Sequence, residues 1–239
     1  MTKAEIETGT PETSGEPQAF RIKSFARRQG RITPGQQKAM DDHWTIYGLD
    51  PRLPLNPMDT FGNQNPIVLE IGFGNGDSLV EMAHQDQARN YIGIEVHRPG
   101  VGHLMLKAHE AGINNLRVYC DDAIDVLNHC IADGSLDRVQ LFFPDPWHKT
   151  RHHKRRIVKE EFLRLIAQKM TPHGIFHAAT DWEDYAIDMV ERLEACPLFT
   201  STVTASPFAP RPDYRPLTKF ESRGHRLGHG VWDLIWTKQ

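Results

Sequence analysis

From residue 66 to the C-terminus, short apolar runs alternate with segments of helical periodicity, and no other sequence feature constrains the fold as strongly. Five apolar runs of strand length, each followed by apolar residues at helical spacing, occupy residues 67–71, 91–94, 116–119, 139–143 and 175–179. Two more strand-like runs, 200–204 and 231–236, follow without a clear helix between them. This order predicts an α/β fold with a doubly wound, seven-stranded, mostly parallel sheet and a terminal antiparallel strand.

The N-terminal quarter of the chain has a different character, and we expect three parts. Residues 1–20 are polar and acidic and predict a disordered tail. Residues 21–60 predict a basic extension with one short helix, because Thr33, Pro34 and Gln36 form a capping-box start for a helix that reaches about Tyr47. Prolines 51, 54 and 57 mark a linker, and residues 61–239 form the main domain.

Charge is unevenly distributed along the chain, although the formal net charge is only -3. Residues 21–31 and 149–156 each contain five Lys or Arg and no acid, and residues 211–226 contain five Arg or Lys against two acids. Such basic segments suit a polyanionic partner, which the net charge alone argues against. The histidines inside the second segment could add positive charge beside phosphate.

Several classes of protein are excluded by simpler features. No stretch is long and apolar enough to span a membrane, and the first twenty residues lack the apolar core of a signal peptide, so a cytoplasmic protein without a membrane partner is expected. The three cysteines are far apart and form no CxxC pair, which predicts reduced thiols and no metal site.

Ligands of doubly wound sheets bind beyond the carboxyl ends of the strands, and the first such end carries a glycine-rich loop. The sequence from Glu70 to Asp77 places glycines at 72, 74 and 76, where the backbone can turn tightly and approach a ligand. The dinucleotide fingerprint would require glycine at position 77, and two acids here would repel a diphosphate. A cationic or zwitterionic ligand fits better.

Acidic residues also follow the second and third strands. Glu95 lies nineteen positions after Gly76, close to the spacing at which an acid accepts hydrogen bonds from ribose hydroxyls. Of Asp121 and Asp122, one suits an adenine amine, whereas the other is solvated or caps the next helix. Together with the glycines, these acids indicate S-adenosyl-L-methionine, whose sulfonium takes the place of phosphates, and hence a methyltransferase.

The fourth strand ends in FFPDPWHK, residues 142–149, where two prolines restrict the backbone around Asp145. This run, together with EIGFGNG, GIEVH, TDWE, TKFE, RRQGR and RGHRLGHGVWD, resembles the bacterial tRNA (guanine-N7)-methyltransferase family over residues 20–239. The resemblance implies a Rossmann-like S-adenosylmethionine-dependent methyltransferase fold and methylation of guanine 46 in the variable loop of tRNA.

The resemblance also implies roles for individual residues, with Asp145 as the catalytic one. The cofactor-binding positions are Glu70, Gly72, Gly74, Gly76, Glu95, Asp122 and Asp145. The substrate-binding positions are Lys149, Asp181, Thr218, Lys219, Phe220 and Glu221, and the RNA-contacting segment is Arg151, His152, His153, Lys154, Arg155 and Arg156.

The expected methyl transfer to guanine N7 requires no general base, and a carboxylate can assist it in other ways. Guanine N7 has a free lone pair and no proton, so positioning can supply much of the catalysis. Asp145 could stabilise the positive charge that develops on the purine, or hold the guanine edge, and the sequence leaves both roles open. Trp147 and Phe220 are candidate stacking surfaces for the target guanine once it is displaced from the stacked bases of the RNA.

Two alternatives remain at this stage. One is another N-methyltransferase, since those also carry an Asn/Asp-Pro motif after the fourth strand. The other is a non-catalytic RNA-binding module. A DNA partner is not expected, and both a monomer and a homodimer stay open.

Overall fold

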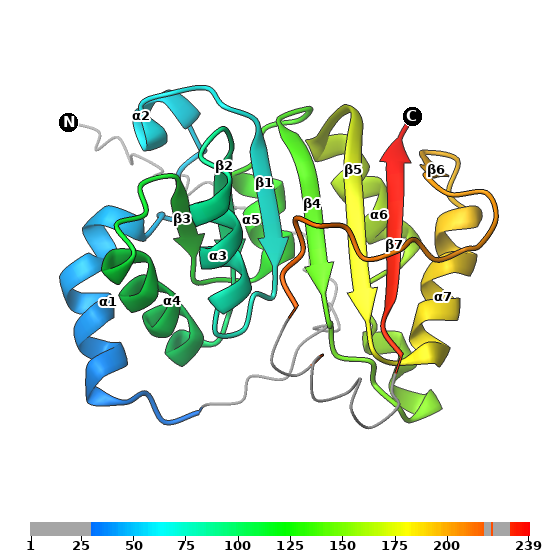
Figure 1. Ribbon diagram of the computed structural model, residues 1–239, viewed down its shortest axis with the longest axis horizontal. Coiled ribbons are helices and arrows are strands. Elements are labelled where there is room, and N and C mark those ends of the chain that lie inside the picture. Colours follow the sequence, from blue (N-terminus) through cyan, green and yellow to red (C-terminus); the bar gives the residue numbers. More distant parts are fainter. Residues whose placement is uncertain (1–29, 218–220, 222–229) are drawn as a thin grey trace, which may run out of the picture.

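The computed structural model describes residues 30–217, 221 and 230–239, and the fold is given for these. They form a seven-stranded sheet in the order β3-β2-β1-β4-β5-β7-β6. The strands are β1 (Ile67–Ile71), β2 (Asn90–Ile94), β3 (Leu116–Tyr119), β4 (Leu136–Phe142), β5 (Met170–Thr180), β6 (Phe199–Ser201) and β7 (Trp232–Lys238). The predicted mostly parallel sheet is confirmed: β7 pairs antiparallel with both β5 and β6 and lies between them (Figure 1).

Helices cover both faces of the sheet, as expected for strands that are apolar throughout. The helices are α1 (Pro34–Tyr47), α2 (Pro57–Phe61), α3 (Asp77–Gln85), α4 (Arg98–Glu110), α5 (Ala123–His129), α6 (Glu160–Lys169) and α7 (Glu183–Glu194), with a 3-10 helix, η1 (Thr150–Arg155). One buried cluster contains side chains of α1, α3 and α4, and a second contains side chains of α5, α6 and α7. Figure 1 shows these two layers on opposite sides of the strands.

The N-terminal helix begins where the capping box predicts. The Gln36 amide donates to Thr33 Oγ1 at 3.3 Å, and the Thr33 amide donates to Gln36 Oε1 at 2.9 Å. Helix α1 lies directly on α4, since a Cβ at Gly102 would stand 2.5 Å from the Gln36 carbonyl oxygen. Residues 34–49 therefore share a core with the sheet, and Leu49 donates its amide to Val118 of β3 at 2.9 Å.

Helix α2 and strand β5 differ most from the sequence expectation. Helix α2 occupies part of the expected linker, because the Asn56 side chain caps its first turn and Pro57 suits its first position. Strand β5 begins at Met170, well before the expected residue 175, because Met170 pairs with Leu136 ahead of a register shift. In the described residues, no helix is long and apolar enough to cross a membrane.

The carboxyl ends of β1, β2, β3, β4 and β5 meet at one edge of the sheet, the lower edge in Figure 1. Strand order reverses between β1 and β4, which is where ligands bind in sheets of this kind. The expected tail, 1–20, and most of the basic segment 21–31 lie outside the described residues.

Candidate active site

The loop after β1 is closed on one side and open on the other. Gly72, Gly74 and Gly76 have φ angles of 74°, 61° and 79°, a left-handed region that favours glycine. A Cβ at Gly76 would stand 2.5 Å from Leu104, and one at Gly100 would stand 2.0 Å from the Gly74 carbonyl oxygen. At Gly72 and Gly74 an added Cβ would meet nothing within 4 Å. The loop thus packs tightly on α4 and leaves backbone accessible to a ligand.

Glu70, the fourth residue of β1, is buried next to this loop. Its side chain is 4% exposed, and its Oε2 has no hydrogen-bond partner among the described residues. Burial, and then the nearby Glu95 carboxylate, raise the pKa of Glu70 to about 8. A buried acid without a partner is costly to ionise, so this position favours a ligand that carries positive charge.

Glu95 holds the glycine loop against the end of β2. Its Oε2 accepts from the Gly74 amide at 2.9 Å, and its Oε1 accepts from the amides of Val96 and His97 at 2.7 and 2.9 Å. A carboxylate has further lone pairs, so contact with ribose hydroxyls remains open to it. The sequence did not indicate this bond to the loop.

The structure shows which of the two acids after β3 caps the helix that follows. Asp122 is the N-cap of α5, and its Oδ1 accepts from the Ile124 amide at 3.0 Å. Asp121 accepts from the Asp122 amide at 2.7 Å. The capping role considered for one of them therefore belongs to Asp122, whose side chain is buried at the same edge as Glu70.

The segment after β4 carries Asp145 between two residues with unusual backbone conformations. Phe143 and Trp147 have φ angles of 51° and 50°, which are costly for side chains of this size. The Phe143 amide continues the pairing with β5 by donating to the Ala179 carbonyl at 2.7 Å. Asp145 is exposed between them. Strain of this kind persists only where surrounding contacts enforce it.

Arg156 supplies one such contact. It donates through Nε to the Pro146 carbonyl at 3.0 Å, next to Asp145 in the chain. Its guanidinium also pairs with Asp184 and with Asp188, 3.2 Å away, both on α7, and lies over the Tyr185 ring. The side chain is 2% exposed. The RNA contact expected of Arg156 stays a prediction, and in this structure its guanidinium is enclosed and its charge is met by two acids.

The other cations of the basic segment face outward on η1. Lys149, Arg151 and Lys154 are exposed, and the Arg155 guanidinium lies 4.5 Å from the centre of the Trp147 ring. Desolvation, and then the neighbouring cations, lower the pKa of His152. In the free protein this histidine therefore adds less positive charge to the segment than an unperturbed histidine would.

The remaining predicted substrate positions are placed only in part. Asp181 is exposed directly after β5. Thr218, Lys219 and Phe220 lie outside the described residues. Glu221 is 3% exposed, and its two carboxylate oxygens each accept a hydrogen bond from Arg215 at 2.7 Å.

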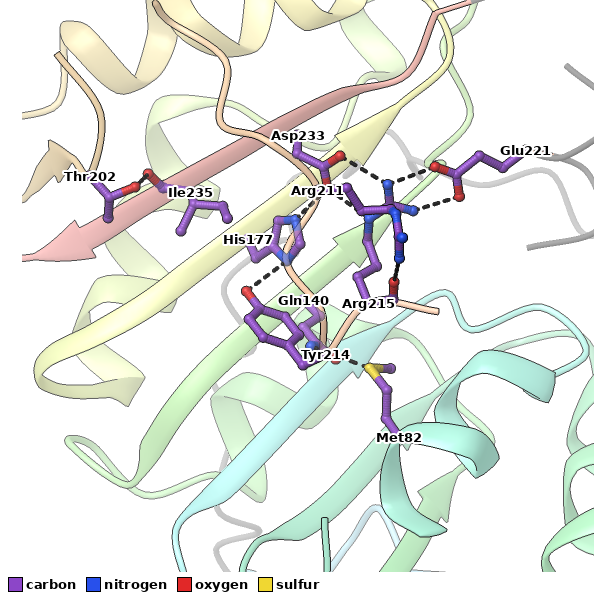
Figure 2. A network of polar contacts seen from close by, with 10 residues as sticks. All are labelled: Met82, Gln140, His177, Thr202, Arg211, Tyr214, Arg215, Glu221, Asp233 and Ile235. Carbon is purple, nitrogen blue, oxygen red and sulfur yellow. Dashed lines mark hydrogen bonds and ion pairs between the residues drawn. The ribbon is translucent and has the colours of Figure 1, made fainter. Parts of the chain in front are cut away.

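Arg215 belongs to a buried polar cluster that sequence reasoning missed (Figure 2). His177 on β5 and Asp233 on β7 are 0% and 3% exposed, with 2.8 Å between His177 Nε2 and Asp233 Oδ1. Arg215 donates to both oxygens of Asp233, at 2.7 and 2.9 Å. One signal was available in the sequence, since a histidine and an aspartate interrupt two otherwise apolar strands.

Comparison with known proteins gives one family and one fold. A family model described as "Putative methyltransferase" matches residues 64–234. The tRNA (guanine-N(7)-)-methyltransferase of Vibrio cholerae serotype O1 (strain M66-2) is 58% identical over 221 residues, 91% of this chain and 92% of that protein. The protein of the same name from Shewanella baltica (strain OS195) is 55% identical over 234 residues, 97% of this chain and 98% of that protein.

Among solved structures, the 16S rRNA methyltransferase KamB superposes with a TM-score of 0.52 at 14% identity, covering 89% of this chain and 97% of that one. At this identity the similarity concerns the fold alone, and it confirms the predicted Rossmann-like methyltransferase fold. No group of His, Cys, Asp or Glu in the described part of the chain is arranged to hold a metal ion.

Proposed function

The chain belongs to the tRNA (guanine-N(7)-)-methyltransferase family, and we propose on that basis that it transfers the methyl group of S-adenosyl-L-methionine to N7 of a guanine in tRNA. Guanine 46 of the variable loop is the proposed position. One observation supports this function above the others: a buried, unpartnered carboxylate, Glu70, lies beside a glycine loop whose backbone is open.

The residues at the edge of the sheet fit this cofactor. The cofactor supplies an electrophilic methyl carbon on a sulfonium, and it also carries an ammonium group. Glu70 offers an acceptor that lacks a partner, and the open backbone at Gly72 and Gly74 admits close approach. We assign Glu70, Gly72, Gly74, Gly76, Glu95, Asp122 and Asp145 to cofactor binding, with Glu95 also holding the loop.

Asp145 is the proposed catalytic residue. The N7 lone pair forms the new N–C bond as the carbon–sulfur bond breaks, so positive charge passes to the purine and no proton is removed. A carboxylate fixed next to the purine stabilises that charge, most strongly once the substrate excludes water. The Arg156 bond to the Pro146 carbonyl limits the freedom of this segment and so helps to aim Asp145.

The outward cations of η1 are the proposed tRNA contacts, because they follow Asp145 directly and stay accessible. Lys149, Arg151, Lys154 and Arg155 would meet phosphates, a contribution that does not depend on sequence. Asp181 remains a proposed substrate contact. Thr218, Lys219, Phe220 and Glu221 also remain proposed substrate positions, and both oxygens of Glu221 accept hydrogen bonds from Arg215.

The decisive experiment maps the methylated atom. The purified protein is incubated with labelled S-adenosyl-L-methionine and an unmodified tRNA transcript, and borohydride–aniline cleavage locates 7-methylguanosine. We expect one cleavage, at guanine 46. A matched transcript with 7-deazaguanosine at that position lacks only N7 and should accept no label. Label on another base atom would favour the other N-methyltransferase, and absence of cofactor binding by calorimetry would favour the non-catalytic RNA-binding module.

A further inference from the structure

One large aromatic side chain is exposed at the ligand edge, directly after the end of β5. Among the exposed large apolar side chains of the described residues, Trp182 is the one aromatic ring, and it is 40% exposed. It is the N-cap residue of α7, but its side chain makes no capping hydrogen bond. Ser, Thr, Asp or Asn would stabilise this helix start better. The stability of α7 therefore does not account for a tryptophan at this position.

Trp182 lies against the segment that carries Asp145. Strands β4 and β5 pair in parallel and end side by side (Figure 1). The Phe143 amide continues this pairing by donating to the Ala179 carbonyl at 2.7 Å, and the Trp182 and His148 ring centres are 4.1 Å apart. In the chain, Asp145 stands between Phe143 and His148. Contacts on both sides of Asp145 thus join its segment to the end of β5.

The indole of Trp182 is held in place although it is exposed. The Trp182 amide donates to Thr180 Oγ1 at 3.2 Å, and the His148 ring packs on the indole with a tilt of 48° between the two planes. These contacts restrict both the backbone and the ring. A stacking surface that is already oriented loses less conformational entropy when a ligand binds.

The other tryptophan near Asp145 offers less free ring surface. The Arg155 guanidinium carbon lies over the Trp147 ring, 4.5 Å from its centre, and the His152 ring meets the same indole edge-on at 6.0 Å. Trp147 is half-buried, whereas Trp182 is exposed. Of these two tryptophans, Trp182 is the one that a nucleotide can reach more readily.

An exposed indole suits the proposed reaction for two reasons. A guanine that has left its stack in RNA needs a new surface, and bases stack on aromatic side chains whatever their sequence. Methyl transfer also places positive charge on the purine, and tryptophan has the aromatic face that attracts a cation most strongly. The stack therefore strengthens as the charge develops, which favours the transition state over the bound substrate.

We propose that Trp182 is the surface on which the substrate guanine stacks beside Asp145, and that its ring face stabilises the charge developing on the purine. This inference rests on the proposed function. Most of the tRNA affinity comes from phosphate contacts. Loss of the aromatic ring should therefore slow methyl transfer within the bound complex and leave the affinities for tRNA and for the cofactor almost unchanged.

The test compares W182F with W182L, because phenylalanine keeps a flat ring whereas leucine keeps only apolar bulk. Single-turnover methyl transfer at saturating tRNA and cofactor is measured, together with both Kd values and the melting temperature. We expect W182L to slow transfer about 10- to 100-fold and W182F to slow it no more than about fivefold. Both Kd values should stay within about threefold of wild type. The melting temperature should change by less than about 3 °C, since the position is exposed.

The matched control is I187A. Ile187 is an exposed apolar side chain of the same helix, α7, at 48% exposure. Its replacement removes a similar kind of surface without removing an aromatic ring, so the transfer rate and both Kd values should stay at the wild-type level.

A W182L rate within about twofold of wild type, or equal losses in W182F and W182L, would overturn the inference. A loss found only in the Kd for tRNA or for the cofactor would overturn it as well. If W182L does not fold, W182M replaces it as the variant without a ring. Wild-type protein that leaves tRNA unmethylated would instead overturn the proposed function, which the failure of Trp182 alone would leave intact.

Discussion

The two halves of the ligand edge use charge in opposite ways. At the ends of β1, β2 and β3 the polar groups are acids, and the most buried of them, Glu70, has an oxygen that no described residue satisfies. At the ends of β4 and β5 the prominent groups are arginines, and the most buried of them, Arg156 and Arg215, are met by acids from α7, β7 and Glu221. The most buried acid of the first half therefore has an acceptor to offer a ligand, whereas the most buried arginines of the second half already have acidic partners.

This difference shows why counting charges along the chain overstates the positive charge that is accessible at the surface. Residues 149–156 contain five Lys or Arg, but the Arg156 guanidinium is enclosed, so four remain accessible. Adjacent arginines, Arg155 and Arg156, consequently serve different purposes: one lies on Trp147 at the surface, and the other fixes the segment around Asp145.

The largest effect is expected where the two halves meet. Asp145→Ala should lower kcat about 10²- to 10³-fold, because it removes the carboxylate that we propose to stabilise charge on the purine. Single-turnover assays measure the loss. Asp137→Ala is the matched control, since Asp137 lies at the opposite end of the same strand and pairs with Arg89 at 3.4 Å. Equal losses in both variants would contradict a specific role for Asp145.

In the acidic half, Glu70→Gln should stabilise the fold and lower the affinity for the cofactor. The folded-state pKa of Glu70 is about 8, above its ordinary value of 4.5, so the folded protein binds more protons between those values and loses stability as pH rises through that window. At pH 8.5 we expect the variant to be about 4 kcal/mol more stable than wild type, with little difference near pH 4.5.

Denaturation at several pH values measures this, and calorimetry should show cofactor affinity at least about tenfold weaker. Glu81→Gln, the same change at an exposed position on α3, should alter neither. A Glu70→Gln variant that binds the cofactor as tightly as wild type would contradict the proposal that the unpaired carboxylate of the acidic half binds the cofactor.

In the basic half, Arg156→Met should cost about 2 kcal/mol of unfolding free energy and lower kcat. Asp184 loses its partner, Asp188 keeps only Arg192, and the Pro146 carbonyl loses a hydrogen bond. The figure is modest since Asp184 is 64% exposed and water can replace the guanidinium there. Urea titration provides the measurement. Arg155→Met should cost less than about 0.5 kcal/mol, and similar costs for the two would contradict the division of roles.

The smallest effect concerns tRNA affinity. Replacing Lys154 and Arg155 by alanine should reduce the slope of log K against log salt by roughly 1.5, because each phosphate contact contributes about 0.7 to 0.9. Filter binding from low to moderate salt measures the slope. Arg156→Met should leave the slope unaltered, and a reduction there would place its guanidinium among the phosphate contacts after all.

Much of this architecture could be predicted because it depends on patterns between residues that are close in the sequence. The five strands from β1 to β5, the capping box at Thr33 and the turn at Gly72–Gly76 each depend on periodicity or on one backbone preference. The acids after β1, β2 and β3 gather because parallel strands end at a common edge. The short α2 was missed, since three nearby prolines suggest a linker although Pro57 in fact begins a helix.

What the sequence determined by itself is therefore the order of elements and the family, since these follow from short-range patterns and motifs, together with the residue types that stand at the strand ends. Only the tertiary structure decided which charges are accessible. His177 and Asp233 are 56 residues apart and Arg156 and Asp184 are 28 apart, so no local spacing announces either pair. Burial and pairing depend on how distant segments pack. In this protein they separate Arg155, which lies over Trp147 at the surface, from Arg156, which is enclosed and binds the Pro146 carbonyl next to Asp145.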